Sequence, residues 1–188
     1  MIVIGITGTL GAGKGTIVDF LLRSEGFAHY SVRGYLVEEI IRRGMEPDRD
    51  KMVMVANELR AAHGSGYIIE QLYEQAKKTG TDCIIESIRA VGEIVSLQNR
   101  GDFFLLAVDA DQRIRYDRIF ARGSETDHID FQTFVANEQR EMTSTDPNKQ
   151  NLSACMKLAN FTLQNNGSVE ELEQNVKNII DGIRRKQH

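Results

Sequence analysis

The residues with the clearest chemical potential lie close to the amino terminus. The run GTLGAGKGT, residues 8–16, directly follows an apolar stretch, and helical spacing begins at once with Ile17, Phe20 and Leu21. Glycines let a backbone wrap around a phosphate chain with its N–H groups turned inward, and a helix amino terminus adds partial positive charge. A lysine at this place reaches the terminal phosphates. The run therefore predicts a polyphosphate-binding loop with these binding residues: Gly8, Gly11, Ala12, Gly13, Lys14, Gly15 and Thr16.

Two other interpretations of this run stay open. A flexible surface loop can follow a strand by chance, although the glycine spacing and the strand and helix context favour a phosphate loop. A dinucleotide-binding loop reads G-x-G-x-x-G, and Thr16 stands where the third glycine is required. We therefore expect phosphate binding, with Lys14 acting on the transferred phosphate.

An arginine-rich segment, residues 109–122, is helical in pattern and follows an apolar run. The spacing of Arg115, Arg118 and Arg122 places three guanidinium groups on one face of a helix. Arg115 fits a pair with Asp111, four positions earlier, but Arg118 has no acid three or four positions away. An anion from outside the helix is the expected partner of Arg118 and Arg122. A solvated helix face is the alternative.

The polar residues 123–130 separate this helix from a second one that contains Arg140. A short polar loop between two arginine-bearing helices indicates a lid, residues 122–140, that closes over phosphates and excludes water. Arg118, Arg122 and Arg140 are then expected to neutralise charge during phosphoryl transfer. An ordinary surface loop with a solvated Arg140 is the alternative.

An acid and a base, Glu86 and Arg89, follow the apolar run that begins at Cys83. Ligands of open parallel sheets bind at the carboxyl ends of strands, so both residues would lie beside the glycine loop if the two strands are neighbours. Glu86 is expected to serve Mg²⁺ and Arg89 to bind phosphate. A strand-end ion pair or a helix cap is the alternative.

Residues 31–80, between the second and third apolar runs, are predicted to form an all-helical insertion that binds the second substrate. Its arginines are the candidate contacts, with Arg33 best placed at a strand end and Arg60 as a further one. A solvated arginine is the alternative for each. The four histidines show no metal-ligand spacing, so metal catalysis through histidine is not indicated.

The elements that must position these residues are short apolar runs of strand length, which alternate with segments of helical period. Their continuous valine and isoleucine content is typical of strands covered on both faces. This pattern predicts an α/β fold, a three-layer α/β/α sandwich with a parallel five-stranded sheet and right-handed crossovers. One helix is expected to end at Gly80, and another to start near Val169 behind a Ser168–Glu171 capping box. The predicted strands are Ile2–Thr7, Phe27–Ser31, Cys83–Ser87, Phe103–Asp109 and Phe161–Gln164.

The composition limits the class of protein. A chain of 188 residues corresponds to about one domain, and a formal net charge of -4 lacks the footprint of a duplex nucleic-acid binder. Cys83 and Cys155 form no disulfide framework or zinc spacing, and no stretch approaches the apolar length of a membrane span. We expect a single cytoplasmic domain, residues 1–188, that is a monomer or homodimer without nucleic-acid or membrane partners.

With these residues assembled, the chain resembles the P-loop kinases of the adenylate kinase and dephospho-CoA kinase superfamily over essentially its full length. The G-K-G-T ending of the glycine loop is the specific feature, and Arg118 and Arg122 are similar to lid arginines of that family. The resemblance implies Mg²⁺ bound with ATP, near Thr16 and through water to Glu86. Residues 159–168 are similar to the segment that lies against the adenine, which implies nucleotide contacts from Asn166 and Gly167.

The same resemblance implies an ATP-dependent nucleotide kinase that transfers the γ-phosphoryl group to a nucleoside monophosphate or another small nucleotide-like acceptor. Neither known acceptor signature is intact, because Val37 stands where adenylate kinases carry an arginine and residues 30–33 lack the paired aspartates of dephospho-CoA kinases. Transfer to a ribose hydroxyl, with Asp109 or Glu86 as the base, is one alternative. A nucleotide-sensing module without transfer, or ATP hydrolysis that drives a partner, is another.

Overall fold

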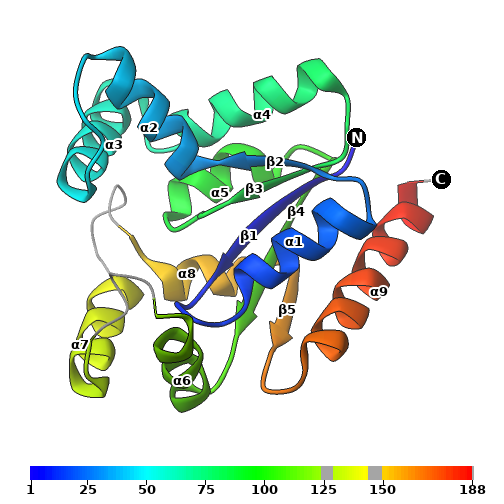
Figure 1. Ribbon diagram of the computed structural model, residues 1–188. Coiled ribbons are helices and arrows are strands. Elements are labelled where there is room, and N and C mark those ends of the chain that lie inside the picture. Colours follow the sequence, from blue (N-terminus) through cyan, green and yellow to red (C-terminus); the bar gives the residue numbers. More distant parts are fainter. Residues whose placement is uncertain (124–128, 144–149, 188) are drawn as a thin grey trace.

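A parallel five-stranded sheet organises the chain, as predicted (Figure 1). The computed structural model describes residues 1–123, 129–143 and 150–187, without the side chains at positions 49, 140 and 187. The strand order is β2-β3-β1-β4-β5, so β1 is central and its neighbours are β3 and β4. The strands match the predicted ones to within one residue at each end: β1 Val3–Gly8, β2 Ala28–Ser31, β3 Cys83–Glu86, β4 Phe103–Asp109 and β5 Phe161–Gln164.

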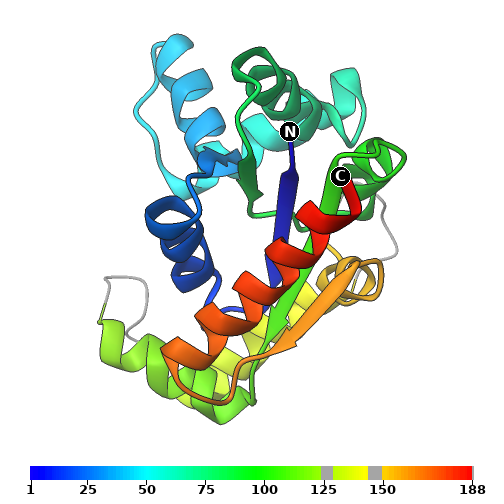
Figure 2. The same cartoon turned by 90° about the vertical axis from the view of Figure 1, so that its right-hand side faces the viewer.

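Helices cover both faces of the sheet, which is why the strands are apolar on both sides. α1 (Lys14–Ser24) and α9 (Val169–Gln187) pack together on one face, as Figure 2 shows. α4 (Tyr67–Thr79), α5 (Val91–Gln98) and α8 (Leu152–Lys157) contact β3, β4 and β1 from the other side. Two buried apolar clusters, one on each face, form the core. The three-layer α/β/α prediction is therefore confirmed.

Between β2 and β3, residues 31–80 are helical except for short connections. Ser31 caps the amino end of α2 (Val32–Arg42), and its Oγ accepts the backbone N–H of Gly34. Asp48 caps the amino end of α3 (Arg49–His63) in the same way, and its carboxylate accepts the backbone N–H of Lys51. Side-chain oxygens at these positions satisfy free amides of the first turn. α2 and α3 lie together at the end of the molecule away from α9 (Figure 1).

Two further helices lie beyond the carboxyl ends of the strands. α6 (Gln112–Arg122) follows β4, and α7 (Phe131–Met142) follows α6 (Figure 1). They include the described parts of the predicted lid. Residues 124–128, at the centre of that lid, lie outside the described residues.

The predicted helix boundaries are also present. Gly80 ends α4 in the left-handed conformation, with φ of 70°. The Ser168 hydroxyl accepts the N–H of Glu171 at the start of α9. Cys83 and Cys155 are both free and buried, and no described helix has the length and apolar content needed to span a bilayer.

The register of the central strands brings chemically active residues to one edge of the sheet. Gly8, the last residue of β1, lies opposite Val108, so Asp109 follows at the next position of β4. On the other side, β1 pairs with β3, whose last residue is Glu86. The glycine loop therefore leaves the sheet between two strands that each end in a carboxylate.

We expect Gly8→Ala to lower the free energy of unfolding by at least about 2 kcal/mol. Gly8 has φ of 142°, and a Cβ there would overlap the carbonyl oxygen of Val108. The control is Gly182→Ala within α9, where a Cβ meets open space. This substitution should stabilise the helix by roughly 0.5–1 kcal/mol. Chemical denaturation measures both, and equal stabilities would contradict the prediction.

Candidate functional site

The glycine loop between β1 and α1 has the conformation that only glycine adopts readily. Gly8, Gly11 and Gly13 have φ of 142°, 80° and 106°, in the region that a Cβ disfavours. Gly13 is the N-cap of α1, no side chain caps that end, and its first turn holds no acid. The free amides and the helix dipole therefore create a site for an anion.

Lys14 starts α1 and folds back into the loop. Its Nζ donates hydrogen bonds to the carbonyl oxygens of Gly8 at 2.7 Å and Thr9 at 2.6 Å. The pKa of Lys14 is lowered from 10.5 to about 8, chiefly by burial and next by the positive charge of Arg89. No described carboxylate forms an ion pair with Lys14. Its charge is therefore available to a phosphate.

A cleft of about 360 Å³ opens beside the loop, within the range of small-molecule sites. Arg118 lines it and donates from Nη1 to the Asn165 carbonyl at 2.9 Å and from Nη2 to the Gly167 carbonyl at 3.3 Å. These acceptors are neutral, so they leave the arginine charge uncompensated. The lining comprises Leu10, Gly11, Gly13, Lys14, Gly15, Thr16, Arg118, Ile119, Arg122, Asn165, Val169 and Leu172.

Asn165 is a site residue that the sequence analysis missed. It is buried, and its Nδ2 donates to the carbonyl of Ala12 at 2.8 Å. A Cβ on Gly13 would lie only 2.5 Å from the same Nδ2. Asn166 accepts the N–H of Asp111 through its Oδ1, and its predicted nucleotide contact stays a prediction. The polar Asn-Asn pair after β5 was a usable signal, but only packing decides which amide faces the loop.

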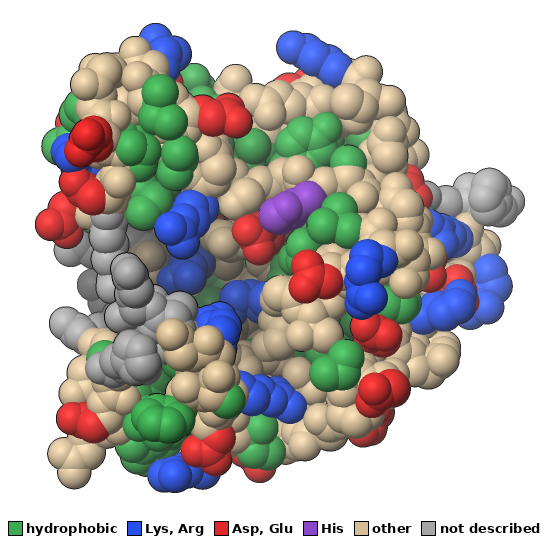
Figure 3. All heavy atoms as spheres, in the orientation of Figure 1, with side chains coloured by type: hydrophobic (Ala, Val, Ile, Leu, Met, Phe, Trp, Pro, Cys, Tyr) green, Lys and Arg blue, Asp and Glu red, His purple; other side chains and the backbone are tan. Residues whose placement is uncertain are grey.

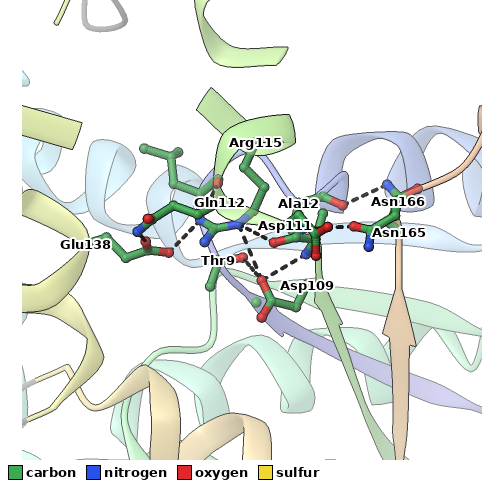
Figure 4. A network of polar contacts seen from close by, with 12 residues as sticks. Thr9, Ala12, Asp109, Asp111, Gln112, Arg115, Glu138, Asn165 and Asn166 are labelled. Carbon is green, nitrogen blue, oxygen red and sulfur yellow. Dashed lines mark hydrogen bonds and ion pairs between the residues drawn. The ribbon is translucent and has the colours of Figure 1, made fainter. Parts of the chain in front are cut away.

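Arg115, unlike Arg118 and Arg122, does not line the cleft; Figure 4 shows it within a network of polar contacts. It is buried beneath the glycine loop, where it donates to the carbonyls of Leu10 at 3.2 Å and Ala110 at 2.7 Å. Its described ion pairs are with Glu138 of α7 at 2.5 Å and Asp109 at 3.4 Å, not with the expected acid one turn earlier. Arg115 therefore holds the loop to α6 and α7.

Asp109 belongs to the same network (Figure 4). Its Oδ1 accepts from the Thr9 hydroxyl at 2.5 Å and from the backbone N–H of Ala110 at 2.9 Å. These contacts support a structural role beneath the loop rather than the alternative role of a base for a hydroxyl acceptor.

Glu86 and Arg89 are on the other side of Lys14, and both charges affect its pKa. Each already has a partner. Glu86 Oε1 lies 3.4 Å from Nε2 of His29, and Arg89 Nη1 lies 3.2 Å from Glu141 Oε2 of α7. β3, which ends in Glu86, is the neighbour of β1, which leads into the glycine loop, and this was the condition set by the sequence analysis.

The two predicted arginines of the insertion lie in different surroundings. Arg33 is exposed in the first turn of α2. Arg60 departs from the prediction of a free substrate contact, because its Nη2 pairs with Glu93 Oε1 at 2.9 Å and the Glu93 side chain is only 1% exposed. Its charge is therefore taken up within the protein, a partnership that the sequence spacing did not reveal.

The lid arginines are only partly described. Arg122 ends α6 and lines the cleft. Arg140 lies in α7, but its side chain is outside the described part of the structure, so its predicted role stays a prediction.

Oxygen donors suited to Mg²⁺ are available near Lys14. Thr16 lies in the first turn of α1 and lines the cleft, and Glu86 ends the adjacent strand. Hydroxyl, carboxylate and phosphate oxygens are the ligands that Mg²⁺ prefers. Within the described residues there is no group of three or more His, Cys, Asp or Glu that could hold a metal ion alone. These residues fit a cation that arrives with phosphate.

Positively charged side chains gather in one hollow of the surface (Figure 3). Figure 3 shows it between the part formed by α2 and α3 and the part formed by α6 and α7, with Lys and Arg side chains gathered inside. Such a concentration of positive charge attracts anions.

Comparisons of sequence agree with this geometry. A family model described as an AAA domain matches residues 4–146. The UPF0200 protein of Hyperthermus butylicus is 30% identical over 186 residues, which cover 97% of this chain and 95% of that protein. The UPF0200 protein of Pyrobaculum aerophilum is 29% identical over 184 residues, covering 97% and 98% of the two chains.

Comparisons of structure identify the fold as that of P-loop kinases. TT1252 from Thermus thermophilus superposes with a TM-score of 0.60 at 23% identity, covering 96% of this chain and 97% of that one. Shikimate kinase from Bacteroides thetaiotaomicron gives 0.59 at 13% identity, with 96% and 98% covered. Dephospho-CoA kinase from Campylobacter jejuni gives 0.53 at 14% identity, with 96% of each chain covered.

We expect the affinity for MgATP to fall as the pH rises through about 8, the pKa of Lys14 in the free protein. Phosphates stabilise the charged lysine, so binding above this pH requires proton uptake, and the Kd should rise on the order of tenfold between pH 7.5 and 9.5. Calorimetry in buffers of different ionisation enthalpy measures both effects. Lys14→Met should bind weakly without this pH dependence, and a flat wild-type profile would contradict the prediction.

Asn165→Ala should weaken MgATP binding by roughly tenfold, because it leaves the Ala12 carbonyl without its donor and loosens the loop at Gly13. Asn166→Ala is the matched control, since the contact described for Asn166 reaches Asp111, and its Kd should change less than about threefold. Titration calorimetry of both variants checks this. A larger effect from Asn166→Ala would reverse the two assignments.

Proposed function

This chain belongs to the AAA-domain family and to the UPF0200 family, and we propose that it is an ATP-dependent phosphotransferase acting on a small nucleotide-like acceptor. The observation that carries the proposal is the uncapped amino end of α1, with Lys14 bound to loop carbonyls and to no carboxylate of the described residues. P-loop kinases in the structural comparison have the same fold.

On the donor side, the loop amides and Lys14 bind the phosphates of ATP. Lys14 exchanges the carbonyls of Gly8 and Thr9 for phosphate oxygens, which offer it a negative charge. Arg118 and Arg122 face the same cleft and supply further positive charge to the phosphates, and we assign Arg140 the same task. Fixed cations of this kind stabilise the charge of a phosphoryl group in transfer.

Mg²⁺ bound with ATP would be held near Thr16 and through water to Glu86, where it would neutralise phosphate charge. The cleft wall formed by Val169 and Leu172 offers an apolar surface to the nucleotide base. The backbone of Asn165 and Gly167 already positions Arg118 beside it.

On the acceptor side, we assign the hollow bounded by α2 and α3. Arg33 and Arg89 are the cations available to an anionic acceptor, and Arg89 must exchange Glu141 for phosphate. We infer a nucleoside monophosphate as the acceptor because its phosphate suits these arginines and needs no base. A hydroxyl acceptor would require Glu86 as the base, after release from His29.

The acceptor-side groups also favour one other function. Arg89, Glu86 and Arg60 are all paired within the protein, which suits a module that binds ATP and responds through the lid without transferring phosphate. The same assay separates the two functions.

Lys14→Ala should reduce phosphoryl transfer by at least two to three orders of magnitude, since it removes a charge aimed at the transferred group. The wild type is incubated with MgATP and a panel of ribo- and deoxynucleoside monophosphates and dephospho-CoA, and diphosphate and phosphorylated acceptor are quantified. Arg43→Met is the control, because Arg43 pairs with Glu39 and Glu58 away from the loop.

Acceptor-dependent ADP formation identifies the kinase and its substrate. Tight MgATP binding without transfer to any acceptor identifies the sensor, and ADP release without an acceptor identifies a hydrolase. Wild-type turnover in Lys14→Ala would remove the proposed function altogether.

A further inference from the structure

Residues 87–90, here called the 87–90 loop, connect β3 to α5 and present Arg89 to the glycine loop. Among nearby side-chain charges, that of Arg89 has the largest effect on the pKa of Lys14. Two hydrogen bonds hold the 87–90 loop. The Thr7 hydroxyl donates to the Ile88 carbonyl at 2.9 Å, and the backbone N–H of Asn151 donates to the Arg89 carbonyl at 2.9 Å. The backbone at Arg89 is therefore held closely.

A third anchor comes from Glu93, a residue with no contact to the cleft. Its Oε2 accepts the backbone N–H groups of Arg89 at 2.9 Å and Ala90 at 3.0 Å. Its Oε1 accepts Nη2 of Arg60, which lies in α3. One carboxylate with 1% exposure thus connects the 87–90 loop, the start of α5 and the helical insertion.

This arrangement is costly in three ways. Glu93 is a buried charge, which requires compensation. The Nε of Arg60 is buried with no hydrogen-bond acceptor among the described residues, and an unsatisfied buried donor destabilises the fold. Ser87 adopts φ of 70°, unlike every other described non-glycine residue. A helix cap alone needs none of these costs, and backbone strain of this kind gathers at functional sites.

We propose that Arg60 and Glu93 form a positioning pair. Through this ion pair, the position of α3 fixes the conformation of the 87–90 loop and so the direction of the Arg89 side chain. The inference rests on the proposed function for its acceptor side, because α3 borders the hollow assigned to the acceptor. Binding there would seat α3, hold Arg60 on Glu93 and orient Arg89 for phosphate. Neither residue of the pair touches the reacting groups.

The test uses Arg60→Met and Glu93→Gln. The glutamine keeps an oxygen for the amides of Arg89 and Ala90 but loses the charge that attracts Arg60. If the pair positions the loop, each single variant should accelerate amide hydrogen exchange at Arg89 and Ala90 by at least about tenfold. The double variant should be no worse than the larger single effect, because both changes remove the same interaction. MgATP affinity should stay within about twofold of wild type.

Arg60→Lys keeps the charge and should restore slower exchange in part, which keeps the test available if Arg60→Met folds poorly. Arg42→Met is the matched control, an arginine whose described ion pair with Glu39 lies within α2 and reaches neither α3 nor the 87–90 loop. It should leave exchange at Arg89 and Ala90 unchanged.

Where an acceptor is found, Arg60→Met should lower kcat, expressed per folded molecule, by on the order of tenfold with the KM for ATP unchanged. Partial unfolding also lowers the apparent kcat, so the folded fraction is measured in the same samples. Wild-type exchange rates at Arg89 and Ala90 in Arg60→Met and Arg60→Lys would overturn the proposal and reduce Glu93 to a helix cap. Hydrogen exchange needs no phosphoryl transfer, so absence of transfer refutes the proposed function without deciding this one.

Discussion

The open amino end of α1 is the constraint on which the rest of the structure depends. Among the described residues, no side chain caps its amides, and two backbone carbonyls are the hydrogen-bond partners of Lys14. Because the loop that creates this end contains three glycines with positive φ, it needs support from outside. That support comes from Asn165 on one side and Arg115 on the other, two side chains that bind loop carbonyls. Both supports bind loop carbonyls, so the loop amides and the charge of Lys14 remain available to a ligand.

The arginines of α6 show how burial separates residues that the helix period groups together. Arg115 enters the interior, where Glu138 and Asp109 compensate its charge. Arg118 and Arg122 lie farther along the helix and line the cleft. An arginine in the interior requires acids close by, whereas one at a cleft can leave its charge to an incoming anion. The same side-chain type therefore supports the loop at one position and lines the cleft at the next turn.

The two sides of the glycine loop differ in how their charges are satisfied. On the cleft side, Arg118 contacts only backbone carbonyls among its described partners. On the insertion side, Arg89 pairs with Glu141, and Glu86 lies beside the His29 imidazole. A ligand on the cleft side gains attraction without displacing an ion pair, whereas a ligand on the insertion side must replace one. Under the proposed function, this difference makes the insertion side the more selective one, since a ligand there must compensate for the ion pair that it displaces.

The sequence by itself determined the strands, the parallel sheet and the glycine loop, because these follow from local apolar runs, glycine at positive φ and a lysine at a helix start. Its spacing also placed Arg118 and Arg122 correctly on one helix face. Tertiary structure decided which side chains find partners within the protein. Glu93 pairs with Arg60, 33 residues away in the chain, and Asn165 rather than Asn166 supports the glycine loop. Partners so distant in the chain have no local signature, since burial and packing alone bring them together.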